Sequence, residues 1–242
     1  MTVTLKCLAP RPMAQTRVVC VPYSGAGPSI YHRFAKAAPA AWEVYAVDAP
    51  GRETRLAEPS LTAWDVYVDA LESALTAMPG GALVLYGHSL GALLALEAAR
   101  RLEQRNAPAA LVCCAAMPWP SGLVDRPRLS GLPDTDFVDA MAAWLGSVPQ
   151  SLHHPDIRES VLPSLRADFL LLERYRFNPA PPLAAPLAVF AGDDDALTKG
   201  RNMDEWRAGT AGAFSQWRIP GGHFFLDGQE DLVIARMVEA LG

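Results

Sequence analysis

The sequence predicts an α/β fold in which a mostly parallel sheet is covered by helices on both faces. Short apolar runs of strand length alternate along the chain with longer segments whose apolar residues recur at helical spacing. Strand-like runs such as residues 17–22 are continuous rather than alternating, which is typical of strands buried on both faces of a parallel sheet. A chain of 242 residues is long enough for one large core, so we expect a single domain over residues 1–242.

The expected strands are short apolar runs bounded by glycine, proline or charged residues. They cover residues 17–22, 44–48, 82–86, 109–116, 187–192 and 214–219. Helices are expected between these strands and after the last one. They cover residues 29–38, 61–78, 90–105, 200–210 and 230–241. Ser29 is the expected N-cap of the first helix, and Pro79-Gly80-Gly81 ends the second.

The segment between the strands at 109–116 and 187–192 shows helical patterns and no strand pattern. One helix is expected over residues 134–145 with an aspartate cap, and another begins at Pro163, because proline suits the first helical turn. Binding sites in parallel sheets lie at the carboxyl ends of the strands. We therefore interpret residues 121–177 as a helical insertion that covers this edge of the sheet, and call it the lid.

The pentapeptide Gly87-His88-Ser89-Leu90-Gly91 lies between the strand at 82–86 and an Ala/Leu-rich helix. A serine between two glycines at such a junction is typical of a nucleophile elbow, a turn so sharp that the flanking positions tolerate almost no side chain. Ser89 is therefore the candidate nucleophile. The backbone N–H of Leu90 would begin the helix, where it can meet a developing oxyanion.

A serine nucleophile needs a general base, and in elbow-containing folds the chain order is serine, acid, histidine. The chain has five histidines. They are His32, His88, His153, His154 and His223. Two of them precede Ser89, and two lie in the expected lid. The remaining one, His223, follows the last strand in a glycine-containing loop, and it is therefore the candidate base.

The acid is expected after the penultimate strand, where the sequence reads Gly192-Asp193-Asp194-Asp195. Three adjacent carboxylates repel one another and cannot all be paired. One of them would be the buried group that orients the histidine, and the others would be solvated. We favour Asp195, with Asp193 as the alternative because its backbone leaves the strand first.

A second oxyanion donor is expected from the loop after an early strand, where Tyr23-Ser24-Gly25-Ala26-Gly27 supplies small residues. The N–H of Ser24 or of Gly25 would serve. A metal site is disfavoured, because adjacent side chains such as His153 and His154 would point apart on a helix. The chain has no phosphate-binding P-loop, and Gly25-x-Gly27 lacks the third glycine of a dinucleotide fingerprint, so no cofactor is expected.

Composition excludes several other classes. The formal net charge of −5 and the lack of a basic stripe disfavour a nucleic-acid partner. No apolar run approaches the ~18 to 20 residues of a membrane span, and residues 1–15 lack the pattern of a signal peptide. The four cysteines form no C-x-x-C motif, and adjacent Cys113 and Cys114 lie in an apolar run. We therefore expect a cytoplasmic protein without membrane association.

With these motifs in order, the chain resembles the stand-alone type II thioesterases of non-ribosomal peptide and polyketide synthases, which are α/β-hydrolases. The resemblance runs nearly from end to end, and the strings that carry it are specific in combination. They are Cys20-Val21-Pro22-Tyr23-Ser24-Gly25-Ala26-Gly27, Pro50-Gly51-Arg52, Tyr86-Gly87-His88-Ser89-Leu90-Gly91-Ala92, Leu162-Pro163-x-Leu165-Arg166-Ala167-Asp168-Phe169, Gly192-Asp193-x-Asp195 and Gly221-Gly222-His223-Phe224-Phe225.

The resemblance implies that Ser89 is the nucleophile, His223 the base and Asp195 the orienting acid. It implies further that the N–H groups of Leu90 and Ser24 form the oxyanion hole and that residues 121–177 are a mobile lid. The family releases acyl groups from the phosphopantetheine thiol of acyl or peptidyl carrier proteins, and so clears misprimed or stalled synthases. A carrier protein acting in trans is the expected partner, and the thioesterase itself is expected to be a monomer.

Some positions depart from the family pattern. The first glycine-rich loop reads Ser-Gly-Ala-Gly where Ala-Gly-Gly-Ser is usual, and Ala196 stands where proline commonly follows the acid. Arg52 belongs to a family string, but the sequence offers no role for it. Two other functions stay open: a generic carboxylesterase or lipase acting on small free esters, and a catalytically silent hydrolase fold that serves as a binding partner.

Overall fold

A computed structural model describes residues 2–123, 126–179 and 181–242 of the chain, so residues 124 and 125 of the expected lid lie outside the described residues. It contains a seven-stranded sheet with the strand order β1-β3-β2-β4-β5-β6-β7. The strands are β1 (Thr4–Ala9), β2 (Thr16–Val21), β3 (Trp42–Asp48), β4 (Ala82–His88), β5 (Leu111–Ala115), β6 (Leu187–Gly192) and β7 (Phe214–Ile219). β1 pairs antiparallel with β3, and all other pairs are parallel. The expected mostly parallel sheet is confirmed.

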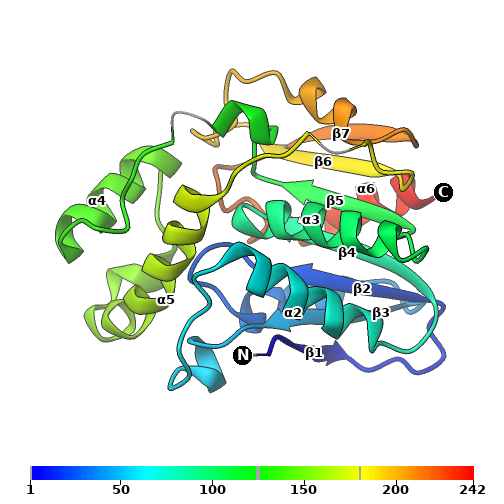
Figure 1. The fold of residues 1–242 in the computed structure, drawn as a ribbon, viewed down its shortest axis with the longest axis horizontal. Coiled ribbons are helices and arrows are strands. Elements are labelled where there is room, and N and C mark those ends of the chain that lie inside the picture. The colour runs from blue at the N-terminus through cyan, green and yellow to red at the C-terminus, as the bar shows by residue number, and fades with distance from the viewer. Residues whose placement is uncertain (1, 124–125, 180) are drawn as a thin grey trace.

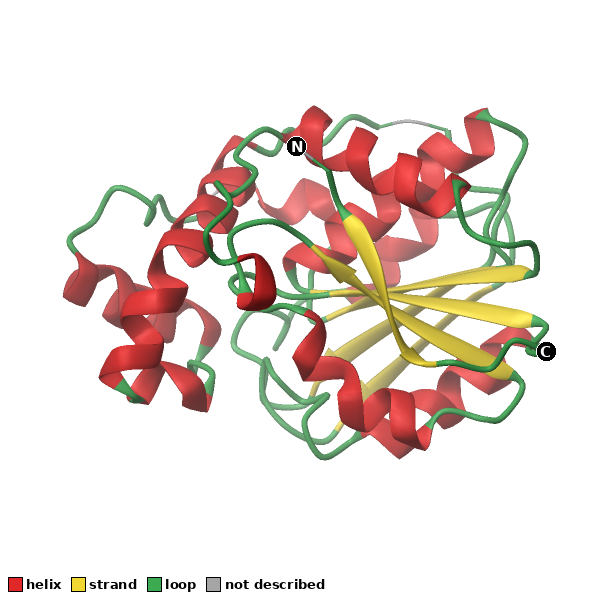
Figure 2. Cartoon of the chain, turned by 90° about the horizontal axis from the view of Figure 1, so that it is seen from below, coloured by secondary structure: helices red, strands yellow, loops and turns green. Residues whose placement is uncertain are grey.

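The α-helices are α1 (His32–Ala37), α2 (Trp64–Thr76), α3 (Leu90–Gln104), α4 (Asp134–Leu145), α5 (Pro155–Arg174) and α6 (Glu230–Leu241). Short 3-10 helices are η1 (Pro28–Tyr31), η2 (Glu53–Arg55), η3 (Pro120–Leu123), η4 (Gln150–His153) and η5 (Met203–Gly209). Helices α2 and α3 cover one face of the sheet, and α1 and α6 cover the other (Figures 1 and 2). α4 and α5 lie beyond the carboxyl ends of the strands, at the left of Figure 1.

Several expected boundaries differ from the structure. The helix expected over 29–38 is divided into η1 and α1, and Ser29 is not its cap, because its hydroxyl donates to the Glu53 carboxylate. Asp134 is the first residue of α4 rather than its cap. Pro163 does not begin a helix: α5 begins at Pro155, and Pro163 lies inside it. The helix expected over 200–210 is the 3-10 helix η5.

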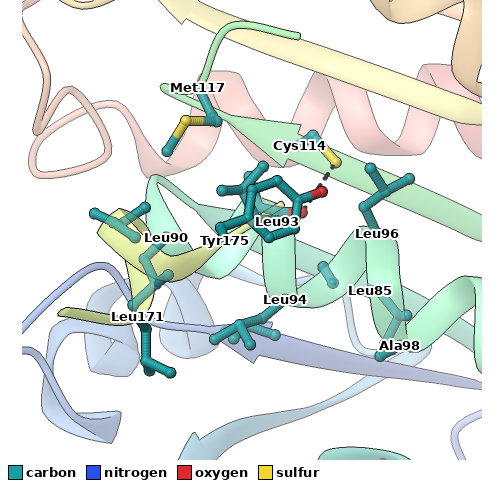
Figure 3. Close-up of a cluster of buried hydrophobic side chains, with 14 of the residues drawn as sticks. Leu85, Leu90, Leu93, Leu94, Leu96, Ala98, Cys114, Met117, Leu171 and Tyr175 are labelled. Carbon is teal, nitrogen blue, oxygen red and sulfur yellow. Dashed lines mark hydrogen bonds between the residues drawn. The ribbon is translucent and has the colours of Figure 1, made fainter. Parts of the chain in front are cut away.

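The larger of two buried apolar clusters lies between the sheet and the α2/α3 layer and continues into the helices beyond it. Figure 3 shows its centre, where Leu90, Leu93 and Leu94 of α3 face Leu171 of α5 and nearby Tyr175. The Tyr175 hydroxyl also donates to Oε1 of Glu97 at 2.8 Å. The end of α5 is therefore packed into the main body of the domain.

The burial of α5 changes along its length. None of residues 155–161 is buried, whereas most positions from Leu162 to Leu172 are. Pro163 has no N–H to donate to the preceding turn, so the backbone is less constrained where the change occurs. α5 thus has an outer half, residues 155–161, and an inner half, residues 162–174, and only the inner half is embedded in the core.

Candidate active site

The turn between β4 and α3 has the geometry of a nucleophile elbow. Ser89 adopts φ 56° and ψ −119°, an unusual conformation for a residue with a side chain. A Cβ on Gly87 would lie 2.0 Å from the Gly91 carbonyl oxygen, and one on Gly91 would lie 2.1 Å from that of Val21. Both glycines are therefore required by close backbone approach, as the sequence pattern predicts.

The structure brings the three candidate catalytic side chains into one hydrogen-bonded line. The Nε2 atom of His223 is 3.0 Å from Ser89 Oγ, and its Nδ1 atom is 3.0 Å from Asp195 Oδ1. Because the carboxylate can only accept, Nδ1 carries the proton and Nε2 is free to accept from the serine hydroxyl. The three residues follow β4, β6 and β7, and all of them are buried. The arrangement is that of a Ser–His–Asp triad.

Asp195 is distinguished from its two neighbours by its surroundings. Its Oδ1 accepts the N–H of Leu197 at 3.0 Å, and its Oδ2 accepts the hydroxyl of Thr198 at 2.9 Å. Burial alone would raise the pKa of Asp195, but its bond to His223, the charge there and these two donors outweigh burial, so its pKa lies below 3.8. Asp193 and Asp194 are exposed. Asp195 is the only one of the three that reaches the histidine.

Two backbone N–H groups near Ser89 are available to an oxyanion. Those of Leu90 and Ser24 have no acceptor within the described part of the chain, and Ser24 lines the same small cavity as Ser89 and His223. The N–H of Gly25, which the sequence left as an alternative, donates instead to Asp168 Oδ2 at 2.7 Å. Of the two alternatives, Ser24 and Gly25, it is thus Ser24 whose N–H remains free to donate.

His88 contacts the loop of His223, which sequence reasoning did not anticipate. Its Nε2 donates to the carbonyl oxygen of His223 at 2.7 Å. Burial, with a smaller contribution from the neighbouring His223, lowers the pKa of His88 to about 3, so this imidazole is neutral at pH 7. It therefore acts as a fixed donor that holds the backbone of the histidine loop. Nothing in the local sequence signals this, because the two residues are 135 positions apart.

Arg52 and Asp168 form a second unanticipated contact. They form a bidentate ion pair, in which Arg52 Nη1 is 3.0 Å from Asp168 Oδ2 and Arg52 Nη2 is 3.1 Å from Asp168 Oδ1. The arginine is 5% exposed and the aspartate is fully buried. The pair joins the loop after β3 to the inner half of α5. It lies directly beside residues 23–27, which we call the Ser24 loop.

The helices beyond the sheet close the site. Met141, Trp144 and Leu145 of α4 and Leu165, Phe169 and Leu172 of α5 line the space above Ser89, which has a volume of only about 10 Å³. A larger cavity of about 390 Å³ lies on the other side of the Ser24 loop, between that loop, η2 and the outer half of α5. The two spaces are adjacent, because both are lined by Tyr23, Ser24, Pro149 and Leu165.

Metal binding finds no support in the part of the chain that the structure describes. Within residues 2–123, 126–179 and 181–242, no group of three or more His, Cys, Asp or Glu side chains is placed to hold a metal ion. Across the same residues, every helix is too short or too polar to cross a membrane. The four cysteines are all free.

Comparison with known proteins points to one family. Residues 16–241 match the family model described as a thioesterase domain. A probable cadicidin biosynthesis thioesterase of Streptomyces griseus is 35% identical over 226 residues, which are 93% of this chain and 62% of that protein. Thioesterase PikA5 of Streptomyces venezuelae is 34% identical over 223 residues, 91% of this chain and 79% of that protein. The chain thus spans less than two thirds of the length of the first of these relatives.

Solved structures show the same likeness. The type II thioesterase BorB from the borrelidin biosynthetic cluster superposes with a TM-score of 0.91 at 31% identity, covering 99% of this chain and 98% of that one. The type II thioesterase YbtT from the yersiniabactin pathway gives 0.83 at 26% identity, with 98% of each chain covered. The mostly parallel sheet and its covering helices are therefore an arrangement shared with solved thioesterases.

Proposed function

Because the chain belongs to the thioesterase family, we propose that it hydrolyses acyl thioesters on the phosphopantetheine arm of carrier proteins in a peptide or polyketide synthase. The observation that supports this most directly is the buried line of hydrogen bonds from Ser89 through His223 to Asp195. The relative named for cadicidin biosynthesis and the solved structures from the borrelidin cluster and the yersiniabactin synthase pathway support the choice of synthase substrates. The role would be editing, in which acyl groups that block a carrier thiol are removed.

In the proposed mechanism, His223 Nε2 takes the proton of Ser89 as Oγ attacks the thioester carbonyl. The N–H groups of Leu90 and Ser24 donate to the oxyanion of the tetrahedral intermediate. Its collapse breaks the carbon–sulfur bond, and the imidazolium returns the proton to the departing pantetheine thiol. Water then attacks the acyl-serine in the same way and releases the carboxylic acid.

Asp195 would hold the imidazole in the reactive tautomer and stabilise the positive charge that forms on it. Its lowered pKa keeps the carboxylate ionised near neutral pH, so this charge is present throughout the working range. The accepted bonds from Leu197 and Thr198 fix the carboxylate against rotation. No metal or cofactor is needed for this chemistry.

Opening of residues 121–177 as a lid is part of the proposal. The space above Ser89 has a volume of about 10 Å³, close to the ~10–15 Å³ that holds a single water molecule, so an acyl group cannot enter the closed site. Movement of α4 and of the outer half of α5 would join this space to the cavity of about 390 Å³. A carrier protein acting in trans would deliver its arm there, to a thioesterase that works as a cytoplasmic monomer.

The test compares carriers of the same acyl group. Short acyl groups on a carrier protein are assayed beside the matching N-acetylcysteamine thioesters and p-nitrophenyl esters. Contacts with the carrier and the arm add remote binding energy, so we expect kcat/KM to be at least about tenfold higher on the carrier, about 1.4 kcal/mol. If free esters are hydrolysed as fast as carrier-bound groups, the carrier proposal fails and a generic carboxylesterase takes its place.

Ser89→Ala is the control for all three substrates. It should lower kcat by on the order of 10⁶, as loss of the nucleophile does in other serine hydrolases. A fluorophosphonate probe should label the wild type at Ser89 alone. Activity retained by this variant would contradict the assignment of Ser89 as the nucleophile, whichever substrate is used. A wild type with no activity on any of the three substrates would favour a silent hydrolase fold.

A further inference from the structure

The ion pair between Arg52 and Asp168 is joined to the Ser24 loop by two further hydrogen bonds. Asp168 Oδ2 accepts the N–H of Gly25 at 2.7 Å, and Arg52 Nη1 donates to the carbonyl oxygen of Ala26 at 3.2 Å. The loop itself is a tight turn, closed by the N–H of Ala26 and the carbonyl of Tyr23 at 3.1 Å. The peptide units 24–25 and 26–27 of the loop are therefore both held by one charged pair.

The backbone of Gly25 is packed against the inner half of α5. Gly25 has φ +76°, and a Cβ there would lie 2.8 Å from Cδ1 of Leu165. The inner half of α5 thus lies directly on the loop, and Asp168 reaches Gly25 from it. Because the N–H of Gly25 belongs to the peptide between Ser24 and Gly25, its bond to a fixed carboxylate sets the rotation of that peptide and so restricts Ser24.

The pair is costly as a purely stabilising device. Two buried charges lose hydration, and well-packed apolar residues often serve stability equally well. Burial alone would lower the pKa of Arg52, but the neighbouring Asp168 carboxylate outweighs it and raises the pKa, so the arginine stays charged. A buried pair of this kind can instead be kept because it fixes one geometry. The geometry that this pair fixes is that of the loop beside Ser89.

We propose that Asp168, held by Arg52, is a positioning residue that aligns the Ser24 N–H for the oxyanion by anchoring the adjacent peptide at Gly25. This rests on the proposed role of Ser24 as an oxyanion donor. Asp168 lies on the inner half of α5, which packs against α3, so the anchor belongs to the body of the domain and stays in place when the outer part of the lid moves.

Two double variants separate positioning from stability. Arg52→Met with Asp168→Asn removes both charges but keeps an amide oxygen for the Gly25 N–H. Arg52→Met with Asp168→Leu has the same shape and no acceptor. Both variants lose the Arg52 donor to the Ala26 carbonyl. The first also leaves the introduced side-chain NH₂ group without an acceptor, and the second leaves the Gly25 N–H without one, so the two should be similarly stable. A direct comparison between them isolates the acceptor.

Both variants are assayed with an acyl-carrier protein and with a p-nitrophenyl ester, because each substrate passes through an oxyanion. Loss of one oxyanion donor lowers kcat by about 10² to 10³, and we expect misalignment to give at least about a tenfold lower kcat in the leucine variant than in the asparagine variant. KM and the apparent pKa of the kcat/KM profile should be equal in the two. If Asp168 had a structural role alone, the substitutions would alter thermal stability but would not change the ratio of the kcat values of the two variants.

Equal kcat values in the two variants, with equal melting temperatures, would overturn the positioning role. If the tenfold difference persists on the ester while the wild type shows no preference for the carrier, then the carrier proposal fails and the positioning role stands. The two proposals are therefore tested separately by the same set of measurements.

Discussion

Asp195→Asn is the substitution for which the structure gives the sharpest expectation. In a triad, an asparagine whose amide nitrogen faces the histidine forces the wrong tautomer and lowers kcat by about 10⁴. Here one oxygen, Oδ1, accepts from both His223 Nδ1 and the N–H of Leu197. The backbone N–H cannot reverse its polarity. An amide nitrogen in the place of Oδ1 would face two donors, so the amide oxygen of the asparagine should take that place. The amide nitrogen then takes the place of Oδ2 and faces the Thr198 hydroxyl, which can accept a hydrogen bond.

The expected loss of kcat follows from the relative energies of the two orientations of the introduced amide. A buried N–H group left without an acceptor costs about 1–3 kcal/mol, so the oxygen-inward orientation should dominate by at least about fivefold. What remains is the loss of charge. A carboxylate and an imidazolium about 4 Å apart attract by about 4 kcal/mol at an effective dielectric constant of about 20. A neutral hydrogen bond keeps about half of this, which leaves a loss of about 2 kcal/mol, or about 30-fold in kcat.

The assay measures kcat for Asp195→Asn and Asp195→Ala on one thioester. Alanine removes the orientation as well as the charge and should lower kcat by about 10⁴. Asp193→Asn and Asp194→Asn are matched controls, because both side chains are exposed, and each should change kcat by less than about tenfold. If asparagine at position 195 is as damaging as alanine, the reasoning that Leu197 fixes the amide orientation is refuted.

Two further predictions concern stability and motion. The pKa of His88 is about 3 in the folded protein and 6.5 in the unfolded chain. Between about pH 3 and pH 6.5 the unfolded chain therefore binds a proton at His88 that the folded protein does not. The contribution of neutral His88 to the free energy of unfolding is thus complete above pH 6.5 and is lost as the pH falls below it. Between pH 7 and pH 5 the wild type should lose about 2 kcal/mol more unfolding free energy than His88→Gln in urea titrations, and an equal loss would exclude this role. Amide hydrogen exchange should be fast in α4 and residues 155–161 but as slow in residues 164–174 as in β4. Binding of an acyl-carrier protein should slow exchange in α4 and residues 155–161. Uniform protection of all these segments would mean that no part of the lid opens.

Elements with a strong pattern agree with expectation to the residue, as β6, β7 and α6 do. β1 was not anticipated, because this half-exposed edge strand has no clear apolar run and is defined by its antiparallel pairing with β3. Pro163 was misplaced for a related reason. Local propensity starts a helix at proline, but burial of Leu162, Leu165 and Phe169 against the core carries α5 across it.

The triad residues were foreseeable because each follows a strand, and parallel strands end at one edge of the sheet. The choice of Asp195 among three neighbours rested on its position and on the family resemblance, and its contacts with Leu197 and Thr198 now supply the physical reason. The contact between Arg52 and Asp168 was not foreseeable. The two residues are 116 positions apart, and although each stands in a family string, no local sequence pattern pairs them. Contacts of this kind exist only once the lid helix has packed on the sheet.

The backbone at Ser89 has an evolutionary consequence. Its φ of 56° and ψ of −119° are unfavourable for any residue with a Cβ, by about 1–3 kcal/mol, and glycine would adopt them with less strain. Stability and chemistry therefore favour different amino acids at this position. A lineage, or a laboratory selection, that rewards only resistance to heat would drift towards glycine here and keep an intact fold. The serine persists only where hydrolysis itself is under selection.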